Sequence, residues 1–585
     1  MKSLQYLNKY LWKYKWLLVL GILFTVISNF FGVRMPIFIK ESIDDLLGNV
    51  QINSLEDALG LSLKIGGIYM GLSILKGLFL FFVRQTIIKM SRYIEFDLKN
   101  EIYAHYQKLD LSFYKNNSIG DLMNRISEDV SLVRMYLGPG IMYSVNLFIM
   151  ATLIIIQMIL ISPMLTLYVL IPLPIMSFII FKVSKKINLQ SKETQEEQSN
   201  LSKLAQETFA GIRILKAYNA VDYKVDEFNQ SSKKFKSKSM KLVLINALFI
   251  PTMLMLIGTS TLATIYIGGL MSFENQISLG GIVAFVFFVN NLTWPFASIG
   301  WVTSIVQRAE ASQKRINEFL NTKPEVFNEN FGASESLKNI EFRNVSYTYR
   351  NTGILALKNL SFEINQGETI AFVGKTGSGK STIINLIMRL LDCDEGEVLI
   401  NKKNIKKINL DDFRKKSGVV PQDVFLFSDT IWNNLVFGLD NKHIDVKDVI
   451  EKTKLCHVHH SIMKFKDQYD TILGERGVNL SGGQKQRITI ARALIGNPEL
   501  ILLDDCLSAI DTDTEDIILT NLKEYTKDKT CLMVSHRIST VRNADKIYFL
   551  HDGQIIEKGS HRELIESNGL YKKMFDEQQL ESKND

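Results

Sequence analysis

Long apolar runs dominate the first half of the chain, and charged stretches separate them. A helix that crosses the hydrocarbon core of a bilayer needs about 20 mostly apolar residues. The first run follows several lysines, as in a signal peptide, but it is long and has no clear cleavage site, so we interpret it as a retained anchor. The pattern predicts six membrane-spanning helices, at about 16–39, 58–83, 141–161, 164–184, 242–270 and 277–305.

The distribution of lysine and arginine predicts how these helices are oriented. The loops at 41–57 and 272–276 contain neither residue, whereas the basic stretches "KVSKK" and "SSKKFKSKSMK" flank the second long connection. Basic residues collect on the cytoplasmic side of membrane proteins. The long connections, about 84–136 and 185–241, contain no proline and show helical spacing. We therefore expect them to be cytosolic extensions of the membrane helices.

Few ionisable side chains fall inside the predicted spans. Arg34 and Lys64 are expected near the outer boundary, and Lys76 and Arg84 near the inner one, where long basic side chains reach the interface. The uncharged polar groups at mid-depth are explained either by hydrogen bonds between helices or by contact with a substrate; they are Asn29, Asn146, Gln157, Asn246, Asn290 and Asn291.

One group of these side chains is a candidate for the lining of a transport cavity. Asn290, Asn291 and Trp294 lie beside Pro295, which kinks a helix. We predict that these three residues face the cavity. Spans without central charges also favour an apolar or amphipathic cargo.

The second half of the chain has the composition of a soluble domain. The change follows "NTKPEV", and we place the boundary between a transmembrane domain, 1–322, and a cytosolic domain, 323–585. The 4 cysteines lie in the second half without paired spacing, which argues against a disulfide framework. The net charge of +7 comes from basic residues gathered beside apolar segments, so membrane topology explains it and no nucleic-acid partner is expected.

A phosphate-binding loop is the clearest motif. The stretch "ETIAFVGKTGSGKSTIINLIMRLL" has the pattern of a strand, a glycine-rich loop of the form GxxxxGK[ST] and a helix. Loop N–H groups and the positive end of the helix hold phosphates, while the lysine reaches the β- and γ-phosphates and the serine binds Mg²⁺. The predicted ATP-binding residues are Gly374, Lys375, Thr376, Gly377, Ser378, Gly379, Lys380, Ser381 and Thr382.

Two further segments complete the predicted nucleotide chemistry. "PELILLDD" is a buried apolar strand whose end presents Asp504, and a carboxylate there is costly unless a cation meets it. In "LSGGQKQR", Ser481, Gly482 and Gly483 open a helix, whose free N–H groups suit an anion such as a γ-phosphate.

The segment "LSGGQKQR" resembles the signature of ATP-binding cassette (ABC) proteins. Other family elements follow in order: Tyr349 resembles the adenine-stacking aromatic, Gln422 the Q-loop glutamine, "SAID" (508–511) the D-loop, and His536 the switch histidine. "GERG" (474–477) resembles a segment typical of exporters. With six spans before the cassette, the resemblance to a half-size ABC exporter covers essentially the whole chain.

The resemblance implies the fold and the roles of these residues. The fold would be a six-helix transmembrane bundle with long cytosolic helical extensions, followed by an α/β P-loop nucleotide-binding domain. "FYKNNSIGDLMNRISEDV" and "ETFAGIRILKAY" resemble the loops that carry the family's coupling helices. Gln422 and Asp504 would join Ser381 as Mg²⁺ ligands, and Gln422, Asp505 and His536 would act in hydrolysis.

The resemblance also implies a dimer. Each ATP would lie between the phosphate loop of one chain and the signature helix of the other, so the signature residues would contact the partner's ATP; these are Ser481, Gly482, Gly483 and Gln484. Such a protein would be integral to the bacterial inner membrane, with its N-terminus and nucleotide-binding domain in the cytoplasm, in contact with the lipid bilayer.

Asp505 departs from the family pattern, in which a glutamate polarises the attacking water. The aspartate carboxylate stops one bond short, and a misplacement of about 1 Å costs on the order of 100-fold in rate. Because the signature is intact, we expect the degenerate half of a heterodimeric exporter whose unlike partner supplies the glutamate. A homodimeric exporter that tolerates aspartate, and an ATP-gated or regulatory membrane protein, are the alternatives.

A separate cluster raises the question of a metal site. "CHVHH", residues 456–460, offers cysteine and histidine at helical spacing. No second cluster of ligands accompanies it in the sequence, and the resemblance places it in a surface helical subdomain, so we favour a structural role.

Overall fold

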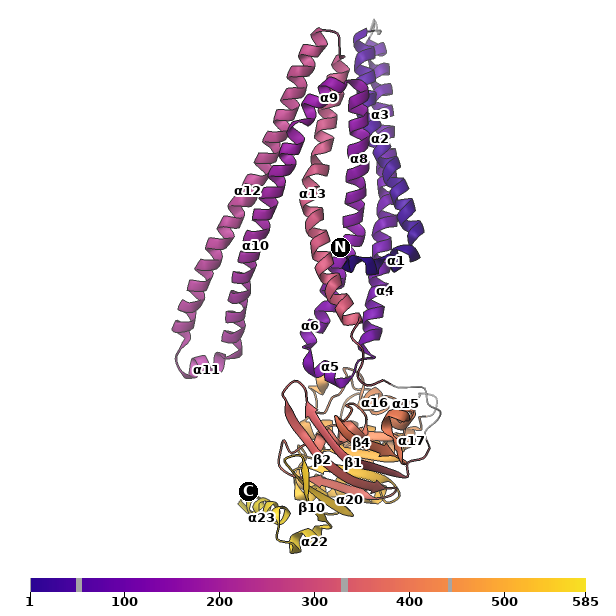
Figure 1. The fold of residues 1–585 in the computed structure, drawn as a ribbon, viewed down its shortest axis with the longest axis vertical. Coiled ribbons are helices and arrows are strands. Elements are labelled where there is room, and N and C mark those ends of the chain that lie inside the picture. The colour runs from indigo at the N-terminus through magenta and orange to yellow at the C-terminus, as the bar shows by residue number, and fades with distance from the viewer. Residues whose placement is uncertain (1, 49–54, 328–334, 440–443, 585) are drawn as a thin grey trace. The chain divides into compact units, whose positions relative to one another are not determined.

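The computed structural model describes residues 2–48, 55–327, 335–439 and 444–584. The chain forms two compact units (Figure 1). The first comprises Met1–Gln107 and Ile119–Thr322, and the second comprises Lys108–Ser118 and Lys323–Asp585. The second unit therefore includes a short segment that is inserted between two helices of the first.

The described residues of the first unit form helices joined by short turns and contain no strand. Three π-helical turns, at 84–88, 125–129 and 136–140, lie within two continuous helices, Leu59–Tyr106 and Ile119–Ile161. The helices of this unit are α1 (Asn8–Lys13), α2 (Lys15–Gly48), α3 (Leu55–Val83), α4 (Lys89–Tyr106), α6 (Ile119–Asn124), α7 (Val130–Met135), α8 (Ile141–Ile161), α9 (Pro163–Leu170), α10 (Pro172–Ala210), α11 (Ile212–Ala217), α12 (Val221–Phe273) and α13 (Leu279–Leu320).

Among the described residues, 5 helices are long and apolar enough to cross a membrane: Lys15–Leu47, Leu59–Tyr106, Ile119–Ile161, Val221–Phe273 and Leu279–Leu320. The remaining predicted span, 164–184, falls on α9 and the start of α10. These helices are separated at Ile171, just before Pro172, whose ring cannot continue the hydrogen-bond ladder of a preceding helix. The predicted extensions at 84–136 and 185–241 are helical for most of their length.

The core of the first unit forms where α13 meets α8 and α9. One face of α13 buries Phe285, Phe288 and Leu292, and Met158 of α8 and Leu165 of α9 join the same cluster. The expected hydrogen bond between helices is present for one pair, since the amide of Asn29 on α2 donates to that of Asn146 on α8 at 2.9 Å. Polar groups that pair in this way satisfy each other inside an apolar bundle.

The register of α2 against α3 corrects the expected depth of the basic residues. The hydroxyl of Ser28 on α2 donates to the carbonyl of Lys76 on α3 at 3.1 Å, so these two residues are level in the two helices. Arg34 is six residues further along α2, or about 9 Å at a rise of about 1.5 Å per residue. The hydrocarbon core of a bilayer is about 30 Å thick, so Arg34 and Lys76 do not lie at opposite membrane boundaries, and that expectation was wrong.

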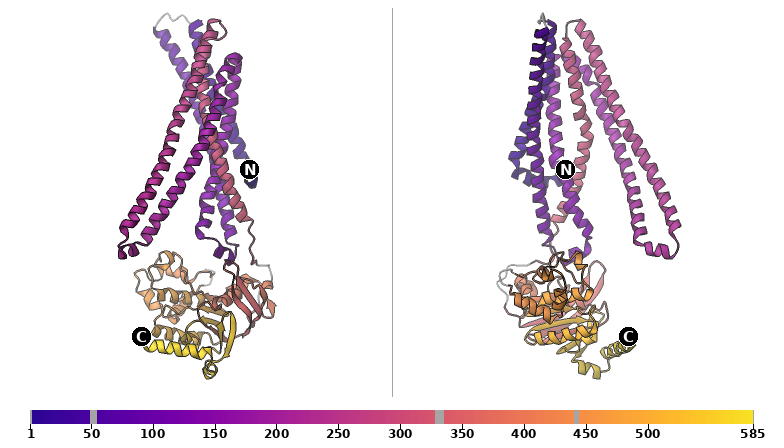
Figure 2. Two further views of the ribbon diagram at one scale, coloured as in Figure 1. Left: turned by 60° about the vertical axis from the view of Figure 1, so that its left-hand side comes forward. Right: turned by 180° about the vertical axis from the view of Figure 1, so that it is seen from behind.

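The helices α10 and α12 form a long hairpin that α11 closes (Figures 1 and 2). Near its other end the hydroxyl of Ser260 on α12 donates to the carbonyl of Val169 on α9 at 2.9 Å. Most of the hairpin surface is exposed in the single chain, including Phe209 at 74% and Tyr218 at 80%.

The second unit contains two sheets. The larger has the order β10-β9-β3-β8-β7-β6, with β3, β6, β7, β8 and β9 parallel, and the smaller is the antiparallel sheet β2-β1-β4-β5. The strands are β1 (Asn339–Tyr349), β2 (Ile354–Asn365), β3 (Thr369–Val373), β4 (Glu395–Ile400), β5 (Lys403–Asn404), β6 (Ser417–Val420), β7 (Leu500–Asp504), β8 (Thr530–Ser535), β9 (Lys546–His551) and β10 (Gln554–Gly559).

Both faces of the larger sheet are covered, as expected for a parallel sheet. Along β7, Ile501 and Leu503 enter one hydrophobic cluster, while Leu500 and Leu502 enter another. The α-helices of the described part of this unit, apart from the inserted segment, are α14 (Lys380–Ile387), α15 (Leu410–Lys415), α16 (Ile431–Leu435), α17 (Val446–Leu455), α18 (His459–Met463), α19 (Gly482–Leu494), α20 (Thr512–Tyr525), α21 (Ile538–Val541), α22 (His561–Glu566) and α23 (Leu570–Asn584).

The inserted segment packs inside the second unit through α5 (Leu111–Asn116). One carboxylate oxygen of Asp110 caps α5 by accepting from the N–H of Phe113, and the other accepts from the N–H of Glu325 at 2.6 Å. The ammonium of Lys115 lies 4.7 Å from the ring centre of Tyr349. This helix falls in the first of the two loops predicted to carry coupling helices.

Candidate nucleotide site

Three neighbouring parallel strands deliver the candidate site. β3, β8 and β7 lie side by side, and their carboxyl ends meet at one edge of the sheet. The phosphate loop follows β3, Asp504 ends β7, and His536 follows β8. These ends border a pocket of about 330 Å³ that is also lined by Tyr349 and Gln422. Strand ends of this kind are where open α/β sheets bind ligands.

The phosphate loop approaches neighbouring backbone so closely that only glycine fits at two positions. A Cβ on Gly374 would lie 2.2 Å from the carbonyl of Leu550, and one on Gly379 would lie 2.2 Å from that of Ala356. Gly379 also has a φ of +99°, in the region that favours glycine. The loop thus presents its backbone to the pocket, directly before the first turn of α14, where free N–H groups attract anions.

The ammonium of Lys380 folds back over this loop. It donates to the carbonyl oxygens of Gly374 and Lys375, both at 2.8 Å. Burial lowers the pKa of Lys380, and the charges of Asp505 and Asp504 partly oppose that shift. A phosphate at the loop would give this half-buried ammonium a direct anionic partner in addition to the two carbonyl groups.

Asp504 forms the candidate cation site with Ser381. The hydroxyl of Ser381 donates to the carboxylate of Asp504 at 2.9 Å, and the side chain of Asp504 is buried. Burial raises the pKa of Asp504, Ser381 opposes the shift, and the charge of Asp505 adds to it. Burial makes the ionised form of this carboxylate unfavourable, so a bound cation would stabilise that form strongly. Carboxylate, hydroxyl and amide oxygens are ligands that Mg²⁺ accepts, so this set, with Gln422 in the same pocket, fits that ion.

Asp505 is held by residues 534–537, the end of β8 and the residues that follow it up to the start of α21, which we call the switch segment. Its backbone has a φ of +47°, a left-handed conformation that aspartate tolerates better than most residues, and its N–H donates to Val534 at 2.7 Å. Nδ1 of His536 lies 2.8 and 2.9 Å from the two oxygens of its carboxylate. Here the carboxylate is directed at His536.

Tyr349 borders the pocket from the smaller sheet. Its hydroxyl lies 3.0 Å from Oγ1 of Thr382, on the helix that starts at the phosphate loop. The ring is therefore fixed at both its hydroxyl and, through Lys115, one of its faces.

The signature residues stand apart from these groups. Ser481 caps α19 in a capping box with Gln484, and neither they nor Gly482 and Gly483 are among the residues that line the pocket. Within the described residues, then, the structure brings together the phosphate loop, Tyr349, Gln422, Asp504, Asp505 and His536, but not the signature.

Side chains that the sequence reasoning missed join the signature helix to the switch segment. Gln486 donates to the hydroxyl of Ser508 at 3.2 Å and accepts from the N–H of Ala509 at 3.0 Å. Arg537 donates to the carbonyl of Ser508 at 3.2 Å and to Glu515 at 3.1 Å. No local pattern marks these residues, since only the folded sheet brings their segments together.

The cysteine and histidine residues at 456–460, raised above as a possible metal site, have structural roles. Cys456 is buried in the core, His459 lies 2.7 Å from the hydroxyl of Tyr469, and no group of three metal-ligating side chains occurs among the described residues.

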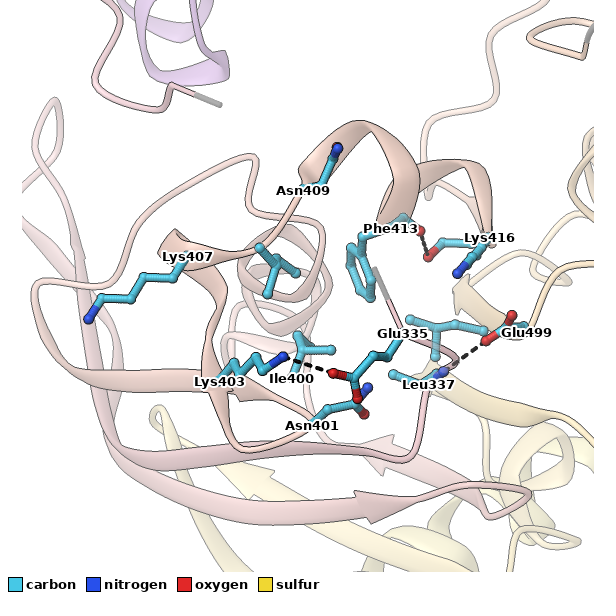
Figure 3. Close-up of a pocket in the computed structure, with 13 residues that line it drawn as sticks. Glu335, Leu337, Ile400, Asn401, Lys403, Lys407, Asn409, Phe413, Lys416 and Glu499 are labelled. Carbon is cyan, nitrogen blue, oxygen red and sulfur yellow. Dashed lines mark hydrogen bonds and ion pairs between the residues drawn. The ribbon is translucent and has the colours of Figure 1, made fainter. Parts of the chain in front are cut away.

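A pocket of about 290 Å³ lies at the end of the smaller sheet (Figure 3), where Glu335 pairs with Lys403 and Glu499 accepts from the N–H of Leu337. These contacts hold the chain as it enters β1.

Comparison with known proteins shows relatives over the whole chain. Residues 18–296 match the family described as the ABC transporter transmembrane region, and residues 357–508 match the family described as ABC transporter. An uncharacterized ABC transporter ATP-binding protein of Bacillus subtilis, YknU, is 32% identical over 98% of this chain and 97% of its own length.

Other relatives carry more specific names. The probable multidrug resistance ABC transporter ATP-binding/permease protein YheI of Bacillus subtilis is 36% identical over 83% of both chains. The ATP-dependent lipid A-core flippase of Haemophilus influenzae is 31% identical over 87% of this chain and 86% of its own. A solved structure of a bacterial Atm1-family ABC exporter with ATP bound shares the fold, with a TM-score of 0.79, 24% identity and coverage of 96% and 98%.

The families, the relatives and the shared fold agree with the geometry of the pocket. The transmembrane helices and the nucleotide-binding domain occur in one polypeptide, in the order expected from the sequence. The protein belongs to the ABC transporter family, and it is an integral membrane half-transporter of the exporter type that couples ATP hydrolysis to transport.

Proposed function

We propose that this chain exports apolar or amphipathic molecules, or moves them between leaflets, as one half of a dimer with an unlike partner. The observation that carries the proposal is Asp505. It follows the cation ligand Asp504, stands where the family has glutamate, and directs its short carboxylate at His536. The chain's own site is then slow in hydrolysis, whereas its signature helix serves a competent site built on the partner's phosphate loop.

The arrangement of the signature supports the second half of this proposal. Ser481 and the glycines after it start a helix whose N–H groups suit a phosphate, yet they lie outside the lining of the chain's own pocket. A nucleotide bound by a second chain would satisfy them. The unlike chain would contribute the glutamate that this chain lacks.

In the proposed cycle, the chain's own residues bind and orient the nucleotide. The phosphate loop and Lys380 would hold the phosphates, and Tyr349 would support the adenine. Ser381, Asp504 and Gln422 would hold Mg²⁺, which would neutralise phosphate charge. Gln422 and His536 then sense the γ-phosphate. ATP binding closes the two nucleotide-binding domains, and hydrolysis at the partner's site releases them.

The substrate class rests on the spans and on the relatives. Asn290 and Trp294 occupy the face of α13 opposite its buried phenylalanines, and Trp294 is 64% exposed in the single chain. Such a surface, mostly apolar with a few amides, suits an amphipathic ligand. Relatives named for multidrug resistance and for lipid A-core flipping fit the same class. In the proposal the N-terminus and the nucleotide-binding domain lie in the cytoplasm of a bacterial cell, which the distribution of basic residues in the loops supports.

Purification of the tagged chain from its native membrane tests the partnership. We expect a second ABC half-transporter in equal amount, with glutamate at the position of Asp505. Recovery of this chain as a homodimer with full, substrate-stimulated ATP turnover would contradict the proposal. ATP binding without any coupled transport by the purified complex would favour the ATP-gated alternative instead.

A further inference from the structure

The C-terminal helix reaches the switch segment through one side chain. The amide of Gln578 on α23 donates from Nε2 to the carbonyl oxygen of His536 at 2.7 Å, and its Oε1 accepts from the N–H of Ile538 at 2.9 Å. Both polar ends of this half-buried amide are therefore used, and both contacts fall within three consecutive residues after β8.

The contact at Ile538 replaces a missing helix cap. The short helix α21 begins at Ile538, and the residue before it, Arg537, makes no side-chain capping bond. The first N–H groups of a helix have no partner within that helix. Gln578 supplies one, and so fixes where the switch segment ends and the helix begins.

The helix that carries Gln578 is firmly attached. Tyr571 is fully buried and its hydroxyl lies 2.7 Å from Nδ1 of His561, while Met574 and Phe575 pack against the core of the unit. Gln578 lies on the next turn of α23. The packing of α23 therefore holds the amide of Gln578 in place beside the switch segment.

We infer that Gln578 is a positioning residue for His536. The amide holds the backbone of His536 from one side, while the carboxylate of Asp505 holds its imidazole at 2.8 Å from the other. The inference rests on the proposed role of His536 toward the γ-phosphate. It adds that the orientation of this imidazole depends on the C-terminal helix, which contributes no residue to the pocket lining.

Single-turnover hydrolysis of radiolabelled ATP by the full-length chain in lipid nanodiscs tests the inference, because this assay resolves slow turnover. Gln578→Met keeps the length of the side chain and removes both hydrogen bonds. Each such bond is worth roughly a two- to tenfold change in an equilibrium. We expect hydrolysis per folded molecule to slow about five- to tenfold, with nucleotide affinity unchanged. The loss of two hydrogen bonds lowers the unfolding temperature in any case, so a merely structural role would show that decrease with an unchanged rate of hydrolysis per folded molecule.

Three further variants make the result decisive. Gln578→Glu removes only the donor to His536 and should slow hydrolysis as well, whereas Glu577→Gln, on the exposed neighbour, should not. His536→Ala sets the scale of the loss. If His536→Ala abolishes hydrolysis and Gln578→Met stays within twofold of the parent chain, the inference is wrong. If His536→Ala itself has no effect, the proposed role of His536 fails and the inference falls with it.

Discussion

At the scale of the residue, Asp504 is a buried carboxylate for which we propose a role in binding a cation. Its pKa is raised, chiefly by burial, so the folded state holds this proton more tightly than the unfolded state. The ionised carboxylate therefore costs stability above its folded pKa, and the cost disappears as the pH falls below the unfolded value. Asparagine in its place would keep an acceptor for the hydroxyl of Ser381 and carry no charge.

This reasoning gives a prediction for Asp504→Asn. Without nucleotide at neutral pH, the variant should unfold at a temperature no lower than the parent chain. The additional stabilisation that Mg²⁺ gives over ATP alone should disappear, because the charged ligand is gone. Thermal unfolding with ATP, with and without Mg²⁺, measures both effects. A variant that is less stable without nucleotide, yet still responds to Mg²⁺, would show that Asp504 is a structural group.

Asp505→Glu tests the weakness of the chain's own site. The longer side chain would carry the carboxylate about one bond further, and positioning errors of about 1 Å are worth up to 100-fold in rate. We expect the purified chain alone to hydrolyse ATP at least severalfold faster with glutamate, while its affinity for ATP stays the same. An unchanged rate would mean that the length of this side chain does not limit turnover.

At the scale of elements, α5 of the inserted segment contacts Tyr349, the tyrosine that we propose supports the adenine. The ammonium of Lys115 lies over the ring of Tyr349, and an exposed contact of this kind is worth about 0.5–1 kcal/mol. Lys115→Ala should free the ring and raise the KM for ATP by about two- to fivefold. Lys108→Ala, an exposed lysine of the same segment, is the control. A KM that falls in Lys115→Ala would show that the lysine competes with the adenine.

The exposed face of α13 gives a prediction about substrate selection. Asn290→Ala and Trp294→Ala should change which compounds stimulate turnover, while basal ATPase stays nearly unchanged. Ile299 is also exposed but lies on the other side of the helix, so Ile299→Ala should leave selection alone. Cysteine cross-linking that places positions 290 and 294 against lipid would refute the proposed lining role.

Predictability differed among the elements for physical reasons. A membrane span can be predicted from a run of about 20 apolar residues, and the phosphate loop can be predicted from the spacing of its glycines. Both signals lie in the local sequence. The break at Ile171 depends on proline packing within an apolar run. The capture of Lys108–Ser118 by the second unit, and the contacts of Gln486, Arg537 and Gln578, depend on distant segments that only the folded sheet brings together.

At the scale of the whole molecule, we propose different functions for the chain's own nucleotide pocket and for its signature helix. The pocket around Lys380 would bind ATP and hydrolyse it slowly, whereas the signature helix would complete the partner's competent site. The connection from Gln486 through Ser508 to Arg537 joins these two regions inside one domain. In the proposal, these hydrogen bonds would be the contacts through which ATP in the slow site affects the signature helix.

Steady-state ATPase of the complex with its native partner tests this division most directly. We predict that Asp505→Asn costs little, because chemistry is not limited at this site. Ser481→Ala should cost about 10²–10³-fold, the usual effect of losing one transition-state contact, and Lys380→Ala should fall between them because it empties a slow site that helps to hold the dimer closed. If Asp505→Asn instead abolishes turnover as completely as Ser481→Ala, Asp505 is a working catalytic carboxylate and the account of a degenerate half is wrong.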